Sequence, residues 1–135
     1  MSIARAKEVI AIEAQAVHAL SRRIGKEFLT AVDLIAKCRG RVVVTGMGKT
    51  GIIGHKIAAT LSSTGTPSLW MHSAEAVHGD LGQVTSNDII ILISSSGETG
   101  ETKQLLPLVK KIGIKIIAVT GNPRSSLAKH SDVVL

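Results

Sequence analysis

Short runs of apolar residues recur along this chain, and stretches with helically spaced apolar residues separate them. The runs are rich in Ile, Val and Leu and lie at 42–45, 68–71, 89–93, 114–119 and 133–135. Such runs are typical of strands buried on both faces, as in a parallel sheet covered by helices. Parallel neighbours need crossover connections, which are almost always right-handed. We therefore expect an α/β three-layer sandwich with a flavodoxin-like, parallel, five-stranded sheet.

Two helices are expected before the first strand. Ile10, Val17 and Ile24 share one face of a helix predicted over residues 3–24, and a similar pattern predicts a second helix over residues 28–36. We expect these two segments to form an N-terminal helical pair.

The length of 135 residues suits one compact domain, so we assign residues 1–135 to a single domain. A sheet of this type normally has a helix after its fifth strand, and here the sequence stops within the run at 133–135. The expectation is therefore an N-terminal part of a longer polypeptide, with the domain incomplete at its C-terminal end.

Composition bears on location and partners. No apolar run approaches the ~20 residues that span a bilayer, and the first residues lack the apolar centre of a signal peptide. The single Cys38 cannot form an internal disulfide, which agrees with a reducing compartment. These features predict a cytoplasmic protein with no membrane partner.

The net charge of +6 fits either nucleic acid or a small anionic substrate as a partner. The densest basic pairs are Arg22-Arg23 and Lys110-Lys111, and neither extends into a patch. Proteins that bind single strands stack bases on aromatic side chains, but this chain has one Trp, one Phe and no Tyr. We therefore expect no nucleic-acid partner and favour a small anion.

The loop Gly46–Gly51 follows the first strand with the spacing G-x-G-x-x-G. Dinucleotide-binding folds place an acidic residue about 20 residues further on, but none ends the second predicted strand here. The phosphate loop of nucleotide hydrolases does not match either, because Val43 occupies the position of its first glycine. Gly48, Lys49 and Thr50 therefore form a small-anion site at a helix N-terminus, or simply a tight turn with a surface lysine.

The loop after the third strand carries a cluster of hydroxyl groups on Ser94, Ser95, Ser96 and Thr99. One hydroxyl is enough to cap a helix, so we interpret this loop as a phosphate cradle assisted by backbone N–H groups and the helix dipole. In flavodoxin-like sheets the ligand binds at the switch between the first and third strands. Both loops are therefore expected to hold one ligand.

The segment Ser94–Thr99, with the sequence SSSGET, resembles the signature of SIS (sugar isomerase) domains. Further segments resemble the D-arabinose 5-phosphate isomerases of that family, namely Gly46–Gly51, Ser63–Pro67 and Glu75–Gly82. The resemblance covers the chain from about Arg39 onward and is weaker in the first two helices. The family's later His-Pro-Gly-Gly-like segment and tandem CBS region do not occur in this sequence, so the isolated fragment need not be active.

This resemblance implies an aldose–ketose isomerase that interconverts D-ribulose 5-phosphate and D-arabinose 5-phosphate through an enediol, without a metal or other cofactor. The product would supply 3-deoxy-D-manno-octulosonate for lipopolysaccharide or capsule. Matched position by position, the resemblance implies a phosphate site and a catalytic set. The phosphate site comprises Thr50, Ser94, Ser96 and Thr99, with Ser95 supplying loop backbone, and the catalytic set comprises Lys49, His78 and Glu101. Gly48 is added to the phosphate site from its place in the turn at the helix N-terminus.

Enediol chemistry needs a base near carbon, an acid–base group near the oxygens and positive charge near the developing oxyanion. Glu101 suits the first role, His78 the second and Lys49 the third. Each residue also has a structural interpretation. Glu101 can be a first-turn helix acid, His78 can bond backbone in a turn, and Lys49 can contact phosphate without moving a proton.

His72, Glu75 and His78 have a spacing that could hold a metal if all three lay on one helix. Gly79 and Gly82 argue against a regular helix there, and we expect no metal site.

Two other functions remain open: a non-catalytic sugar-phosphate-binding regulatory SIS module, and an isomerase of another phosphosugar. By resemblance to SIS proteins, we expect a homodimer or homotetramer with His78 close to a neighbour's phosphate loop.

Overall fold

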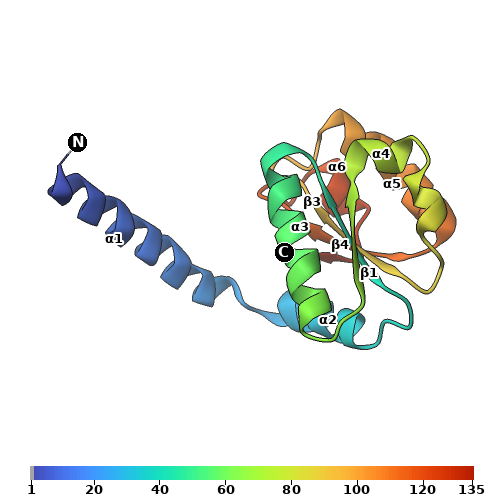
Figure 1. Ribbon diagram of the computed structural model, residues 1–135, viewed down its shortest axis with the longest axis horizontal. Helices are drawn as coiled ribbons and strands as arrows, with labels where there is room; N and C mark the ends of the chain where they lie inside the picture. Colours follow the sequence, from blue (N-terminus) through green and yellow to red (C-terminus); the bar gives the residue numbers. More distant parts are fainter. Residues whose placement is uncertain (1) are drawn as a thin grey trace.

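The structure is a computed structural model and describes residues 2–135 (Figure 1). Its centre is a parallel sheet of five strands in the order β2-β1-β3-β4-β5. The strands are β1 (Val42–Gly46), β2 (Ser68–His72), β3 (Ile89–Ile93), β4 (Lys115–Val119) and β5 (Val133–Val134). The predicted strands and the flavodoxin-like order are confirmed.

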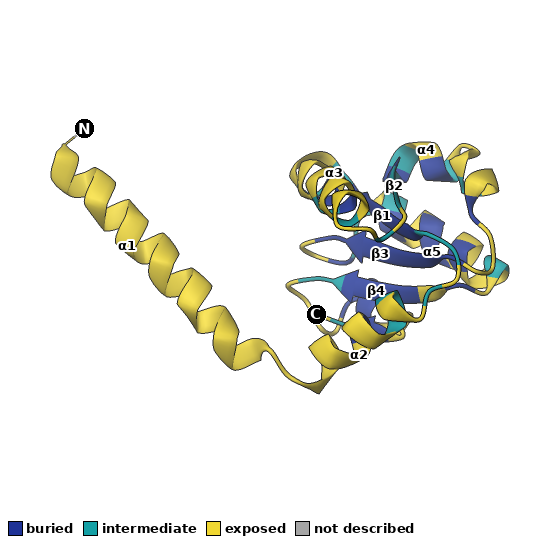
Figure 2. Ribbon diagram, turned by 60° about the horizontal axis from the view of Figure 1, so that its bottom comes forward, coloured by how far each residue is buried: buried dark blue, intermediate teal, exposed yellow. Residues whose placement is uncertain are grey.

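Helices cover both faces of this sheet and make the three predicted layers. Val42 and Val44 of β1 point to one face, where they pack with α2 (Lys26–Ala36) and α3 (Gly48–Ser63). Val43 points to the opposite face, which is covered by α4 (Ser73–Val77), α5 (Gly100–Ile112) and α6 (Ser126–Lys129). Figure 2 shows β1, β3 and β4 in the dark blue of buried residues, with helices on either side of them. The core is aliphatic because Ile, Val and Leu supply its buried strand positions.

The strands β1, β3 and β4 end level with one another. Gly46 lies opposite Ile93, and Ile93 lies opposite Val119. The loops that leave these strands therefore begin side by side at one edge of the sheet.

Both predicted N-terminal helices are present, as α1 (Ile3–Leu20) and α2 (Lys26–Ala36), but they do not pack against each other. Helix α1 (Ile3–Leu20) and the short 3-10 helix η1 (Ser21–Arg23) have no buried residue, and Figure 1 shows α1 extending away from the sandwich. Ile24 and Gly25 are both extended, so the chain does not make the tight reversal that an antiparallel pair requires. Helix α2 packs on the sheet instead, through the buried Ala31.

The apolar side chains of α1 lie in solvent as a consequence. Ile10 is 66% exposed and Val17 is 67% exposed. No helix within residues 2–135 is both long and apolar enough to cross a membrane.

Candidate functional site

The two predicted ligand loops meet at the carboxyl ends of β1 and β3. They enclose a pocket of about 260 Å³. The pocket is lined by Met47, Thr50, Ile93, Ser94, Ser95, Ser96, Thr99 and Thr102. Five of the six predicted phosphate-binding residues thus lie together, and the sixth, Gly48, is the first residue of α3.

The first loop makes a sharp entry into α3. Gly48 has a φ of +57°, in the region that glycine adopts most readily. The Thr50 side-chain oxygen accepts a hydrogen bond from the Met47 N–H at 3.2 Å and lies 3.1 Å from the carbonyl oxygen of Ile93. Thr50 therefore links the first loop to the end of β3.

The serines of the second loop use their side chains to form turns. The buried Ser94 accepts a hydrogen bond on Oγ from the Gly97 N–H at 3.1 Å, and Ser96 Oγ accepts one from the Glu98 N–H at 3.2 Å. A serine hydroxyl that accepts one bond can still donate its own hydrogen. Both hydroxyls therefore keep a donor for an anion in the pocket.

Thr99 begins helix α5. Its side-chain oxygen accepts from the Thr102 N–H at 3.4 Å and lies 2.8 Å from the Thr102 hydroxyl. The Thr99 hydroxyl therefore caps helix α5, which is the simpler interpretation of this side chain. The same position puts the N-terminus of a 13-residue helix at the pocket, where the helix dipole favours negative charge.

Glu98 has a role in this loop that the sequence did not reveal. Its carboxylate accepts hydrogen bonds from the Lys103 Nζ at 2.8 Å and from the Ser126 N–H at 2.5 Å. These partners lower the pKa of Glu98 from its ordinary 4.5 to about 2. The stabilisation from its ionised form is therefore present above pH 4.5 and is lost as the pH falls through about 2.

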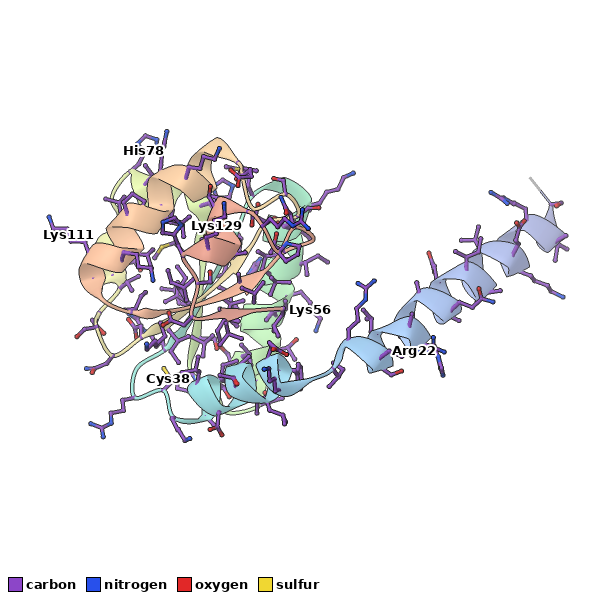
Figure 3. The ribbon with its side chains drawn as sticks, turned by 180° about the vertical axis from the view of Figure 1, so that it is seen from behind. Arg22, Cys38, Lys56, His78, Lys111 and Lys129 are labelled. Atoms are coloured by element: carbon purple, nitrogen blue, oxygen red, sulfur yellow. The ribbon has the colours of Figure 1, made fainter. Side chains whose placement is uncertain are left out.

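Lys49, His78 and Glu101 are absent from the lining of the pocket. Lys49 is exposed on the first turn of α3, and Glu101 is partly exposed on the first turn of α5. His78 follows the last residue of α4, and Figure 3 shows it at the outer surface of the domain. Its backbone N–H lies within hydrogen-bonding distance of the Ala74 and Glu75 carbonyl oxygens, where His78 is the C-cap of α4.

Residues 34–135 match the family model of the SIS domain. The chain belongs to the SIS domain family. Both ligand loops lie inside the matched residues, whereas α1 precedes them.

Two relatives of this SIS domain are both named arabinose 5-phosphate isomerase. The chain is 52% identical over 130 residues to the arabinose 5-phosphate isomerase KdsD of Pseudomonas aeruginosa, covering 96% of this chain and 40% of that protein. It is 47% identical over 134 residues to the arabinose 5-phosphate isomerase KpsF of Escherichia coli O6:H1, covering 98% of this chain and 41% of that protein. The chain therefore spans about two-fifths of the length of these curated relatives.

A solved structure shares the fold closely. The E. coli CFT073 protein c3406, solved in complex with arabinose 5-phosphate, superposes with a TM-score of 0.90 at 43% identity. The match covers 99% of this chain and 73% of that one.

His72, Glu75 and His78 do not lie together on one helix in this SIS domain. Within residues 2–135, no three His, Cys, Asp or Glu side chains gather closely enough to hold an ion. His72 ends β2, and α4 begins only at Ser73 and has five residues. The three side chains are therefore not on one helix, which the spacing argument required.

The close packing of Gly97 gives a first prediction. A Cβ at Gly97 would lie 2.2 Å from Ser125 Oγ, and the residue has a φ of +64°. We expect Gly97→Ala to lower the free energy of unfolding by about 2–4 kcal/mol, from the clash and the strained backbone together. Chemical denaturation of both proteins measures this change.

Gly100→Ala is the matched control, because a Cβ there meets no atom within 4 Å. Its unfolding free energy should stay within ~0.5 kcal/mol of the parent. Equal effects of the two substitutions would mean that Gly97 is not packed as described.

Proposed function

We propose that this SIS domain binds a phosphorylated sugar. We further propose that the full-length protein interconverts D-ribulose 5-phosphate and D-arabinose 5-phosphate, as a source of 3-deoxy-D-manno-octulosonate. The observation that carries the proposal is the pocket in which hydroxyls from two loops converge beside a helix N-terminus. The names of KdsD and KpsF and the arabinose 5-phosphate complex of c3406 support the choice of sugar.

The pocket suits a phosphate dianion for physical reasons. Ser94 and Ser96 hold their side-chain oxygens in place by accepting hydrogen bonds from loop N–H groups, which leaves their hydroxyl hydrogens to donate. The Thr50 hydroxyl instead donates to backbone carbonyls within the protein. Donors fixed before the ligand arrives lose little entropy when they bind it. The dipole of α5 adds attraction for negative charge.

In the proposed reaction, a proton leaves C2 of the aldose and a proton is delivered to C1 through an enediol intermediate. We assign Glu101 as the carbon base, His78 as the group that moves protons between the sugar oxygens, and Lys49 as the cation beside the enediolate. Lys49 and Glu101 lie on the first turns of α3 and α5, the two helices that start at the pocket. This arrangement supports their proximity to a sugar whose phosphate is held there.

A binding-only module is the second candidate for this chain by itself. The observation that favours it is the absence of Lys49, His78 and Glu101 from the lining of the pocket. Both candidate functions predict phosphate binding, but only the isomerase predicts turnover of the sugar.

We also propose a homodimer or homotetramer in the cytoplasm. The exposed apolar side chains of α1 and α2, such as Val17 and Leu29, support association of subunits. The position of His78 at the outer surface supports a role for it in a neighbouring subunit's site. The single Cys38 agrees with a reducing compartment.

Binding is tested by calorimetric titration of this chain with D-arabinose 5-phosphate. Ser96→Ala should weaken binding by about 1–3 kcal/mol, because a hydrogen bond to a charged oxygen is lost. Ser86→Ala, at an exposed serine far from the pocket, is the control and should bind like the parent. Unchanged affinity of Ser96→Ala, with its fold intact, contradicts the phosphate cradle.

Catalysis is tested in the full-length protein by NMR, with ribulose 5-phosphate in deuterated water. Glu101→Gln should retain binding while turnover falls by on the order of 10²–10⁴. Exchange of deuterium into the sugar carbon should fall in parallel. Fast exchange with slow turnover would assign the carbon base to another residue, and binding without any turnover in the parent would favour the binding-only module.

The shared site is tested by mixing full-length His78→Ala and Ser96→Ala subunits under conditions in which subunits exchange. If His78 serves a neighbour, some sites in the mixture carry both intact residues, and activity should return to a measurable fraction of the parent value. Sedimentation analysis checks that the mixed oligomers form. Exchange without any recovery of activity means that each His78 serves its own chain.

A further inference from the structure

A carboxylate lies within the proposed phosphate loop, where simple electrostatics would disfavour it. Glu98 sits between Ser96 and Thr99, both of which line the pocket. A negative side chain beside a phosphate site repels the ligand unless a partner neutralises it. The position of Glu98 therefore needs a physical reason of its own.

The hydrogen-bond donors that the Glu98 carboxylate contacts lie on α5 and α6. Oε1 accepts from the Ser126 N–H at 2.5 Å, and Oε2 accepts from the Ser126 hydroxyl at 3.1 Å. Oε2 also accepts from the Lys103 ammonium at 2.8 Å. Both oxygens are thus occupied, and the negative charge is balanced by a lysine in the first turns of α5.

The backbone of the same loop is fastened to the same part of the chain. The Gly97 carbonyl oxygen accepts from the Leu127 N–H at 3.1 Å, and the Ser95 carbonyl oxygen accepts from the Gly121 N–H at 3.0 Å. The loop is therefore held at two points by the segment that runs from the end of β4 into α6. Glu98 adds the charged side-chain bond to these backbone bonds.

We infer that Glu98 is a positioning residue that fastens the phosphate-binding loop to α6 and keeps the serine hydroxyls aimed into the pocket before a ligand arrives. The inference rests on the proposed phosphate site. Glu98 touches no ligand in this role and acts through Ser96 and the loop backbone, since its own N–H donates to Ser96 Oγ. Because its pKa is held at about 2, the carboxylate stays ionised throughout the neutral range.

A positioning role and a purely electrostatic role predict opposite changes in anion affinity when Glu98 is replaced. Removing a negative charge near a phosphate site should tighten anion binding if only electrostatics matters. Loss of a positioning residue should weaken binding, because the loop must then be ordered at the expense of the binding free energy. The sign of the change therefore separates the two explanations.

The experiment titrates this chain and its variants with inorganic phosphate and with D-arabinose 5-phosphate, at pH 5 and pH 8. Glu98→Ala should weaken binding of both ligands by on the order of 10-fold. Glu98→Gln keeps an acceptor for the Ser126 N–H and should fall between Glu98→Ala and the parent. The ratio of variant to parent affinity should be the same at both pH values, because Glu98 does not titrate between them.

Glu75→Ala removes an equal charge from the exposed surface of α4 and is the matched control. Its affinity should match the parent or rise slightly. Hydrogen exchange supplies a second measurement: the amides of Ser126 and Leu127 should exchange faster in Glu98→Ala, while those of the buried strand β3 stay protected.

Binding by Glu98→Ala that equals or exceeds that of the parent overturns the inference, as does unchanged exchange at Ser126 and Leu127. If Glu98→Ala does not fold, Glu98→Gln decides by the same two measurements. If the parent binds neither ligand, the proposed phosphate site fails. Exchange at Ser126 and Leu127 then still shows whether Glu98 holds the loop.

Discussion

The parallel pairing of β1 with β3 is the interaction on which the rest of this domain depends. Its register sets Gly46 opposite Ile93, so both ligand loops leave the sheet at the same level. A slip of one residue would move each buried side chain to the opposite face. That slip is strongly disfavoured, because both faces of these strands are packed with aliphatic side chains. The packing of the core therefore fixes the geometry of the pocket.

A serine hydroxyl can both accept and donate a hydrogen bond, and two serines of the pocket use only the acceptor within the protein. Ser94 and Ser96 accept hydrogen bonds from loop N–H groups, and this fixes the oxygens. Their hydrogens are left to donate. The adjoining α6 segment supports the loop from behind through Ser125 and Ser126. A loop supported in this way can present a fixed set of donors to an incoming anion.

Helix α1 stands outside this arrangement. Its apolar residues remain exposed, while the nearby α2 buries Ala31 against the sheet. Large contiguous exposed apolar patches are typical of surfaces at which proteins associate. The family match begins at residue 34, within α2, so α1 lies outside it.

The sequence by itself determined the five strands, their parallel arrangement and the two loops that line the pocket. These features depend on apolar periodicity, turn residues and clustered hydroxyls, which can be recognised within short segments of the sequence. Only the tertiary structure decided that α1 does not pack on α2, that His72 belongs to β2 and not to α4, and that Glu98 fastens its loop to Ser126. Glu98 and Ser126 lie 28 residues apart in sequence. A pattern confined to one segment does not encode which distant backbone N–H its side chain will reach, because that distance is set by how the whole sheet and its helices pack.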